Sequence, residues 1–375
     1  MKIIHCADLH LDSSLSGNLP EDMRRDRREE LFESLVRLVD YANKEDIRHI
    51  IIAGDLFDRA EVRNDIKKRV YELFRSNGKI TFYYLRGNHD GTIASDSEAL
   101  DNLREFAEDW TYYSLDGCEV GGSTDSFTAK KRVRIAGIEL GYMSASEASK
   151  RLSLDEKDVN ILVLHGQVAE YDGGGDIIPL SSFRNRFIDY MALGHLHTYS
   201  MGDLDARGRY CYSGCLEGRG FDECGLCSAV LLDVDETSGQ IDTSRIELAK
   251  RRIFTCEVDL SRLEWDIELA ITTELEKLGV RSQDMVKIIL KGEVADELEI
   301  NTSYIERAYG EVYYYVKAVD QTSRKRDDEL TSGIEASLRG EFIRLVEAEE
   351  SLDTASRKRI IRIGLSALSG ENLWD

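Results

Sequence analysis

Hydrophobic and polar positions follow two alternating patterns over the first 250 residues. Seven short apolar runs predict strands, at residues 3–7, 50–53, 80–85, 133–138, 160–164, 190–193 and 229–234. Apolar residues at helical spacing predict a helix through Leu31, Leu35, Leu38, Val39 and Ala42, and a second helix is expected over about residues 64–76. Strands that alternate with helices indicate the α/β class, so we expect a layered α/β domain over residues 1–250.

The pattern changes after Lys250. Three further strands are expected, at residues 253–260, 285–290 and 311–318. A helix is expected between the first two of them, with its apolar positions at Ile267, Ile271, Leu275 and Leu278. These elements indicate a small α+β module over residues 251–325.

Two helices are expected in the last part of the chain, residues 326–375. The first begins near Asp328, and its apolar stripe consists of Leu330, Ile334, Leu338, Phe342 and Leu345. The second has its apolar positions at Ile360, Ile361, Leu365 and Leu368. Such stripes must be buried, either on the body of this protein or in a groove or coiled-coil base of a partner, and the pattern does not distinguish the two.

Length and composition favour a globular protein of two or three domains. A chain of 375 residues is long for one hydrophobic core. No apolar run has the length that spans a membrane, and Met1-Lys2-Ile3-Ile4 leads directly into a strand without a leader segment. Seven cysteines in so long a chain fit a reducing compartment. We therefore expect a cytoplasmic protein with no membrane association.

Four cysteines have the spacing C-x3-C-x8-C-x2-C, at Cys211, Cys215, Cys224 and Cys227. Four thiolates can in principle hold a zinc ion. The alternative is a set of small buried thiols, and the absence of a C-x2-C spacing in the first pair favours it.

The net charge of -22 and the pI of about 4.8 differ from those of a protein that binds nucleic acid through a basic face of its own. Local basic clusters occur at residues 24–28, 130–132, 250–252 and 324–326, where solvated loops and helix faces are the simpler interpretation. A nucleic-acid substrate would require a locally positive cleft or a partner that supplies the basic surface.

Most of the side chains that suit a metal lie in five short segments. The segments are Asp8-Leu9-His10, Gly54-Asp55-Leu56-Phe57-Asp58, Gly87-Asn88-His89-Asp90, His165-Gly166 and Gly194-His195-Leu196-His197. Each follows a predicted strand, which is where α/β sheets place their ligands. Residues two apart in extended backbone point the same way, so Asp8 with His10 and His195 with His197 are expected to aim at a common centre. Histidine with carboxylate suits Mn, Fe or Zn, and the set is too large for one ion.

The order D-x-H, G-D-x-x-D, G-N-H-D, H-G and G-H-x-H resembles the calcineurin-like binuclear metallophosphoesterases. Three segments resemble the SbcD exonuclease branch of that family, at residues 4–11, 190–197 and 221–225. The resemblance implies a layered sandwich of two sheets flanked by helices, followed by a small α+β capping module and the C-terminal helical pair.

The resemblance also implies the roles of individual residues. Asp8, His10, Asp55 and His197 would hold the first metal ion, and Asp55 would bridge to a second, held also by Asn88, His165 and His195. His89 would face the scissile phosphate as a proton donor or a stabiliser of charge, and Asp58 and Asp90 would orient histidines or backbone. Manganese is the expected metal, with Fe, Zn and Mg as alternatives.

The implied function is that of a metal-dependent phosphodiesterase. In the SbcD branch it would be a DNA exonuclease or endonuclease subunit that acts on DNA ends in repair, by water activated between two metals. The expected partners are DNA, an SMC-like coiled-coil ATPase subunit and a second copy of the chain. Residues 212–220 instead resemble a related phosphoesterase group with Glu-Gly-Arg. A phosphoesterase for a small molecule or a phosphoprotein, or a metal-binding scaffold of low turnover, therefore stays open.

Overall fold

Two six-stranded sheets form the centre of the molecule. The computed structural model describes residues 1–15, 19–59, 61–91, 100–115, 130–141, 143–261, 266–295, 298–324, 338–349 and 352–368. The strand order of the first sheet is β14 (Ile241–Ile246), β13 (Ala229–Val234), β1 (Lys2–Cys6), β2 (His49–Ala53), β3 (Thr81–Leu85) and β4 (Leu103–Glu105). The strand order of the second is β11 (Ser200–Asp203), β12 (Arg209–Tyr212), β10 (Tyr190–Gly194), β7 (Val159–His165), β6 (Val133–Gly137) and β5 (Thr111–Ser114). A short pair, β8 (Gln167–Ala169) and β9 (Ile177–Pro179), lies beside them.

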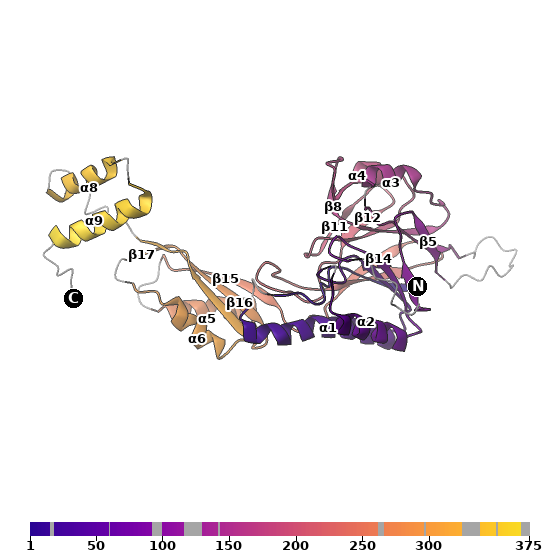
Figure 1. The fold of residues 1–375 in the computed structure, drawn as a ribbon, viewed down its shortest axis with the longest axis horizontal. Helices are drawn as coiled ribbons and strands as arrows, with labels where there is room; N and C mark the ends of the chain where they lie inside the picture. Colours follow the sequence, from indigo (N-terminus) through magenta and orange to yellow (C-terminus); the bar gives the residue numbers. More distant parts are fainter. Residues whose placement is uncertain are drawn as a thin grey trace.

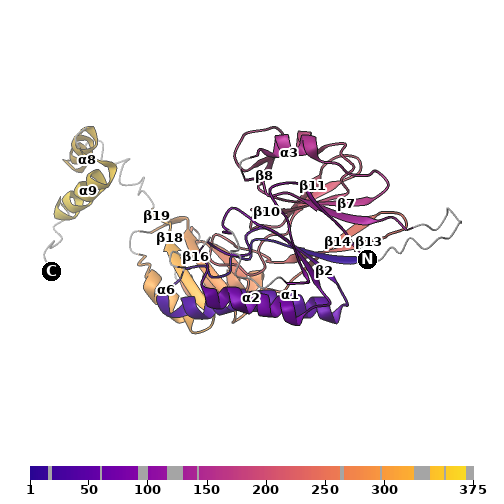
Figure 2. The same cartoon turned by 45° about the vertical axis from the view of Figure 1, so that its right-hand side comes forward.

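Helices cover the outer faces of both sheets (Figures 1 and 2). The first sheet carries α1 (Glu21–Lys44) and α2 (Asn64–Ser76), and the second carries α3 (Ala145–Arg151) and α4 (Leu180–Phe183). A third apolar layer, which includes Ile51 and Ile161, fills the space between the sheets. The expectation of a layered α/β sandwich is confirmed.

Helix α1 illustrates how the apolar pattern specifies a layer. Leu31, Leu35 and Leu38 recur at helical spacing, and each is at most 1% exposed against the first sheet. Glu21 in the first turn and Lys44 in the last complement the helix dipole. The predicted helix over residues 64–76 coincides with α2.

The central strands are parallel, so their carboxyl ends share one edge of each sheet. In the first sheet β1, β2 and β3 run parallel. In the second sheet β6, β7, β10 and β12 run parallel, with Gly194 of β10 paired to His165 of β7. Side chains in the loops after these strands are thereby brought to the same end of the molecule.

The small module has a parallel sheet and a core of its own. Its strands are β15 (Ile253–Asp259), β16 (Met285–Lys291) and β18 (Tyr315–Asp320), with the short pair β17 (Glu293–Val294) and β19 (Ser323–Arg324) and the helices α5 (Ile267–Leu278) and α6 (Thr302–Gly310). The strand predicted at residues 311–318 is wrong in its first four residues. The N–H groups of Val312 and Tyr313 donate to the carbonyl of Tyr309 and close the end of α6, so the strand begins at Tyr315.

A buried cluster of charged side chains joins the module to the first sheet's helical layer. Arg27 of α1 forms ion pairs with Glu30 and Glu217. Arg251 pairs with Glu30 at 2.6 Å, donates its backbone N–H to Glu217 at 3.2 Å, and lies over the ring of Tyr314. The division of the chain at residues 250 and 325 stays a prediction, and this cluster crosses the first boundary.

The C-terminal pair consists of α8 (Leu338–Ala348) and α9 (Thr354–Leu368), which contact each other and lie apart from the body in Figure 1. Phe342 packs on Gly364, whereas Leu345 is 68% and Ile363 is 47% exposed. The predicted stripe positions Leu330 and Ile334 lie outside the described residues. Within the described chain, no helix is both long and apolar enough to cross a bilayer.

Candidate metal centre

The five sequence segments meet at the shared edge of the two sheets. Their predicted metal ligands are Asp8 and His10 after β1, Asp55 after β2, Asn88 after β3, His165 at the end of β7, and His195 and His197 after β10. Three overlapping groups have ligand atoms within 4.8 Å of one another: Asp8 with His10 and His197, Asp8 with Asp55 and His165, and His10 with Asp58 and His89.

The loops after β1 and β2 are tied together through their main chains. The N–H of Asp8 donates to the carbonyl of Gly54, and that of His10 to the carbonyl of Asp55, both at 3.0 Å. Asp8, His10 and Asp55 have φ angles of 53°, 45° and 51°. Left-handed backbone costs on the order of 1–3 kcal/mol at a residue with a side chain and is concentrated at functional sites.

The expectation that paired ligands lie in extended backbone is wrong. Asp8 and His10 follow the end of the strand and are left-handed, and His195 has a φ of 106°. The turn itself brings Asp8 and His10 together beside His197. His195 instead lies next to His165, with the two ring centroids 5.5 Å apart.

Two glycines leave room for ligand side chains. A Cβ on Gly54, whose φ is +95°, would lie 2.1 Å from Nδ1 of His165. A Cβ on Gly87 would lie 2.2 Å from Oδ1 of Asp55. Any other residue at either position would displace a ring or a carboxylate of the site.

The Asp55 carboxylate lies between histidines of both sheets. It is 2% exposed, and its Oδ2 lies 3.6 Å from Nε2 of His10 and 3.4 Å from Nε2 of His165. Its Oδ1 accepts the backbone N–H of His89 at 3.0 Å. Burial raises the pKa of Asp55, but the hydrogen bond and charge of His165, with His10, outweigh it and lower the pKa to about 2. The carboxylate is therefore ionised.

Both ring nitrogens of His165 contact oxygen atoms. Nδ1 lies 3.0 Å from the carbonyl oxygen of Ala53, which can only accept, so Nδ1 carries a proton. Nε2 lies 2.9 Å from Oδ1 of Asn88. Burial lowers the pKa of His165, but Asp55 and then Asp8 raise it to about 9. The oxygen atoms around Nε2 thus attract positive charge, as a cation site requires.

His10 and His197 face each other through their Nε2 atoms, 3.1 Å apart. Their other ring nitrogens face carboxylates: Oδ1 of Asp58 lies 3.3 Å from Nδ1 of His10, and Oε1 of Glu223 lies 2.7 Å from Nδ1 of His197. A carboxylate at Nδ1 holds the proton there and leaves the Nε2 lone pair for a metal. Together with Asp8, the two imidazoles form a mixed nitrogen and oxygen donor set that fits Mn, Fe or Zn.

Asp8 and Asp90 accept hydrogen bonds from the main chain of neighbouring loops. Asp8 accepts the N–H of His195 at 2.9 Å, and Asp90 accepts those of Phe57 at 2.8 Å and Gly87 at 2.9 Å. Burial raises the pKa of each carboxyl to about 6, although these backbone N–H groups oppose the rise. Both residues thus fix the loops that carry the candidate ligands.

His89 lies at the solvent-exposed side of the site. Its Nδ1 is 3.0 Å from the carbonyl oxygen of Asp58, and its ring centroid is 5.0 Å from that of His10. The backbone N–H bond to Asp55 anchors it. His89 is therefore next to the candidate ligands and accessible to a substrate.

Sequence reasoning missed Arg219 and Glu223, which lie in the loop after β12. Glu223 contacts His197, and Arg219 donates to Asp58 at 2.8 Å and to Glu223 at 2.6 Å. The Glu-Gly-Arg segment and residues 221–225 resemble segments of known phosphoesterases. Their spacing alone gave no sign that they approach a histidine of another loop.

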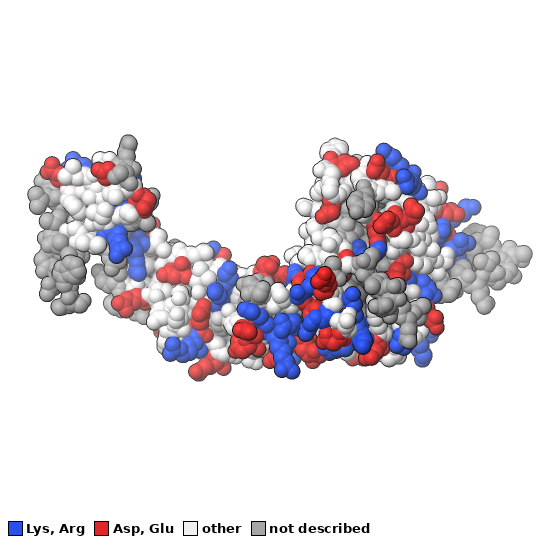
Figure 3. All heavy atoms as spheres, viewed as in Figure 1, with Lys and Arg blue, Asp and Glu red and all other residues white. Residues whose placement is uncertain are grey.

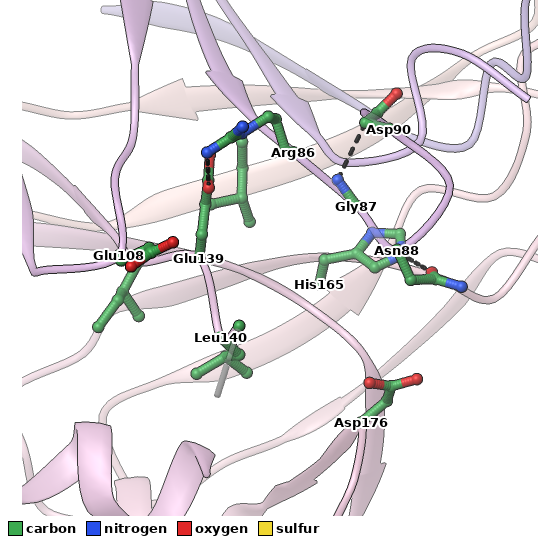
Figure 4. Close-up of a pocket in the computed structure, with 12 residues that line it drawn as sticks. Arg86, Gly87, Asn88, Asp90, Glu108, Glu139, Leu140, His165 and Asp176 are labelled. Carbon is green, nitrogen blue, oxygen red and sulfur yellow. Dashed lines mark hydrogen bonds and ion pairs between the residues drawn. The ribbon is translucent and has the colours of Figure 1, made fainter. Parts of the chain in front are cut away.

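A cavity of about 300 Å³ adjoins the site (Figure 4). Asn88 and His165 line it next to the metal centre, and Leu85, Ile138 and Leu140 supply apolar wall. Its other charged lining residues are Arg86, Asp90, Glu108, Glu139 and Asp176, of which Arg86 and Glu139 form an ion pair. Acidic groups therefore outnumber basic ones in this wall.

The four cysteines do not come together. The sulfurs of Cys215 and Cys227 lie 3.5 Å apart in the interior, whereas Cys224 is exposed and contacts Thr255. Cys211 is buried, with its sulfur 3.6 Å from a backbone carbonyl. All four are in the described chain, and no three of them form a group that could hold a metal. Three of the four cysteines are therefore buried thiols, and Cys224 is an exposed one.

Charge on the surface is mixed. Figure 3 shows Lys and Arg side chains over α1 and the adjoining module, interspersed with Asp and Glu. Arg69 of α2 and Glu29 of α1 form one such pair, and Lys250 lies near Glu33. The face in view is thus not a continuous basic surface.

The fold and the site define a metal-dependent phosphoester hydrolase of α/β class. The model of the calcineurin-like phosphoesterase family matches residues 1–199, more than half of the chain. The chain belongs to this family, whose members depend on two metal ions.

Individual relatives are more distant. The chain is 29% identical over 212 residues to the uncharacterized metallophosphoesterase YhaO of Bacillus subtilis, a match that covers 52% of this chain and 48% of that protein. It is 27% identical over 229 residues to the SbcD component of the nuclease SbcCD of Staphylococcus epidermidis, with 52% and 57% covered. It is 26% identical over 280 residues to the DNA double-strand break repair protein Mre11 of Aeropyrum pernix, with 69% and 64% covered. The chain thus spans about half of the first two relatives and less than two thirds of the third.

Proposed function

We propose that this protein hydrolyses phosphodiesters at a centre of two divalent metal ions and that its substrate is the end of a DNA molecule. The convergence of histidine, carboxylate and amide side chains from five loops carries the proposal. The first ion would be held by Asp8, His10, Asp55 and His197, and the second by Asp55, Asn88, His165 and His195. Manganese is favoured, with Fe, Zn and Mg as alternatives.

The chain's own residues supply charge and orientation. When bound, a pair of such ions neutralises the phosphate and makes a water molecule nucleophilic near neutral pH. Asp55 contributes negative charge between the two positions, whereas Asn88 contributes a neutral oxygen and so leaves the centre positive toward a phosphate. Asp8 and Asp90 hold the loops through main-chain N–H groups.

His89 is proposed to act on the substrate itself. The carbonyl of Asp58 accepts the proton of Nδ1, which leaves Nε2 of this exposed ring for the substrate. A histidine placed there can donate a proton to the leaving oxygen or stabilise charge on the phosphoryl group.

The choice of DNA rests on the relatives named as part of a nuclease and as a double-strand break repair protein, and on the segments that resemble the SbcD branch. The net charge of -22 is unfavourable for DNA, so a partner should contribute basic surface. We propose an SMC-like coiled-coil ATPase in that role, docked on residues 326–375, where Leu345 and Ile363 are exposed. A homodimer through helices of the first domain completes the proposed assembly.

A substrate panel tests the proposal. Linear duplex DNA, single-stranded DNA, a cyclic nucleotide and a phosphomonoester are compared with Mn²⁺ present, with and without the ATPase of a neighbouring gene. Preference for linear DNA, increased by the ATPase, is the expected result. Removal of residues 326–375 should abolish co-purification with that ATPase and spare hydrolysis of a simple phosphodiester, whereas unchanged co-purification would count against the docking site.

A phosphoesterase for a small molecule is the second candidate, and the cavity favours it. A volume of about 300 Å³ is at the lower end for ligand pockets. Its acidic wall suits a neutral or cationic group next to the phosphate and disfavours further phosphates of a DNA strand. Hydrolysis of the cyclic nucleotide or the monoester, without hydrolysis of DNA, would establish this candidate.

A further inference from the structure

Five side chains form a closed ring of polar contacts at the first proposed metal position. Nδ1 of His10 lies 3.3 Å from Asp58, which accepts from Nη1 of Arg219 at 2.8 Å. Nη2 of Arg219 donates to Glu223 at 2.6 Å, and Glu223 lies 2.7 Å from Nδ1 of His197. The ring closes where Nε2 of His197 meets Nε2 of His10.

Arginine suits the centre of this ring because its planar fork can serve two carboxylates at once. Besides the bond from Nη2, Glu223 accepts from Nε of Arg219 at 2.9 Å and from its backbone N–H at 2.7 Å. Nη1 remains for Asp58 on the other side. A lysine carries the same charge on one nitrogen and cannot reproduce this geometry.

Burial makes the pairing necessary. Glu223 is 2% and Arg219 is 16% exposed, so an unpaired carboxylate here would be costly. Arg219 contacts the same oxygens, Oδ1 of Asp58 and Oε1 of Glu223, that face Nδ1 of His10 and Nδ1 of His197. Its positive charge therefore balances the two carboxylates that lie beside the candidate ligands.

We propose that Glu223 and Arg219 are positioning residues of the metal centre, which fix the rings of His10 and His197 so that both Nε2 lone pairs point at the same ion. Glu223 acts directly on His197. Arg219 holds Glu223 and Asp58 in register, and its Nη2 also lies 3.1 Å from Nδ1 of His197. The inference rests on the proposed function, because it requires an ion at these histidines. The Glu-Gly-Arg loop thereby has a function in the metal centre, although none of its residues is among the proposed metal ligands.

Manganese binding to the full-length protein tests the inference. Titration calorimetry and the Mn²⁺ electron paramagnetic resonance signal are recorded for the wild type and for Glu223→Gln. Oε1 of Glu223 faces Nδ1 of His197 and the Arg219 guanidinium, while Oε2 accepts the backbone N–H of Arg219. A glutamine has one acceptor oxygen and cannot serve both sides, so we expect affinity at one of the two positions to fall by about 10–100-fold. The unfolding temperature without metal is measured alongside, and the Mn²⁺-induced rise in that temperature should shrink.

Asp189→Asn is the matched control. Asp189 forms a similar two-point ion pair with Arg207, at 2.8 and 2.9 Å, and precedes β10 at the end opposite the metal centre. This variant should lose comparable stability and bind Mn²⁺ with wild-type affinity.

Arg219→Lys keeps the positive charge but changes the hydrogen-bond geometry. It also tests the inference if Glu223→Gln does not fold. We expect about a tenfold loss of Mn²⁺ affinity despite the conserved charge. The double variant should bind no more weakly than Glu223→Gln alone, because both residues act through one ring.

The inference would be overturned if Glu223→Gln bound Mn²⁺ with wild-type affinity, or if Arg219→Lys did so when only that variant folds. It would also be overturned if the losses of affinity of the two single variants multiplied in the double variant. A lower unfolding temperature with unchanged Mn²⁺ binding would reduce both residues to a structural role and also overturn it. Failure of the wild type to bind Mn²⁺ or to hydrolyse any phosphodiester is a different result, because it rejects the proposed function itself.

Discussion

The loops after β1, β2, β3, β7 and β10 form the metal edge of the molecule. The metal edge and the C-terminal helical pair differ in which kind of side chain they bury. At the metal edge, polar groups are buried: Asp8 and His10 are each 1% exposed, and Asp55 is 2% exposed. On the helical pair, apolar groups are exposed, with Leu345 at 68% and Ile363 at 47%. In most proteins polar side chains are exposed and large apolar side chains are buried. The metal edge departs from this rule by burying polar groups, and the helical pair departs from it by exposing apolar groups.

The difference lies in how much of each region the chain completes by itself. The metal edge is assembled by long-range contacts, such as that between His10 and His197, and its loops are joined by hydrogen bonds to Asp8 and Asp55. The helical pair makes its contacts locally, as between Phe342 and Gly364. We therefore expect the metal edge to carry out catalysis and the helical pair to bind a partner. Four experiments test this contrast.

Removal of metal should have the largest effect. Dialysis against a chelator is expected to abolish hydrolysis of a simple phosphodiester, because the residues of the metal edge supply no nucleophile without the ions. Circular dichroism should still show a folded protein, since the three cores around the sheets are apolar. Mn²⁺ should restore the rate, and hydrolysis that persists in metal-free protein would reject the two-metal centre.

The second largest effect is expected for His89→Ala. This variant should lose about 10²–10⁴-fold in kcat and retain both metal ions. The loss is expected because His89 is exposed next to the proposed ligands and is assigned to the substrate rather than to either metal ion. His49→Ala is the control, since His49 lies at the start of β2, away from the metal edge. An unchanged rate in His89→Ala would favour a scaffold of low turnover.

Stability of the metal-free protein should depend on pH through His165. Its pKa is raised from the ordinary 6.5 to about 9 in the folded chain, so folding binds this proton more tightly. The stabilisation is complete below pH 6.5 and is lost as the pH rises through 9, about 3 kcal/mol in all. Urea unfolding of the wild type and His165→Gln at pH 6 and pH 9.5 measures it. Equal pH dependence of the two proteins would contradict the assignment.

A change on the helical pair should have the smallest effect on the protein alone. Leu345→Glu replaces an exposed side chain, so the free energy of unfolding should change by less than about 0.5 kcal/mol. Leu35→Ala in α1 is the buried comparison, with an expected loss of about 2–5 kcal/mol. Hydrolysis by Leu345→Glu should be unchanged, and a large loss of stability would mean that this surface is covered within the protein.

Local periodicity predicted the elements whose apolar pattern is strong. The helix through Leu35 and the strand at residues 50–53 were found because burial on one side or on both leaves a regular signal. The strand ends also predicted where the candidate ligands lie. Helix α6 was missed, although Asn301 caps it through the N–H of Tyr304, because a nine-residue helix with one fully buried residue, Ile305, has a weak pattern.

Long-range and backbone features could not be read from the sequence. The left-handed turns at Asp8 and His10 replace the extended backbone that spacing had implied, because main-chain bonds to the neighbouring loop fix them. The approach of Arg219 and Glu223 to His197 depends on how β10 and β12 pair, which no local pattern encodes.

The charge cluster around Arg27 and Glu30 determines how the chain can be shortened. A fragment that stops at residue 250 would lack Arg251, so Glu30 would lose a buried cation and Glu217 would lose a backbone N–H donor. Removing one partner from a buried ion pair typically costs about 3–5 kcal/mol. The first 250 residues are therefore expected to unfold at lower urea concentration than residues 1–324, although both contain every candidate metal ligand.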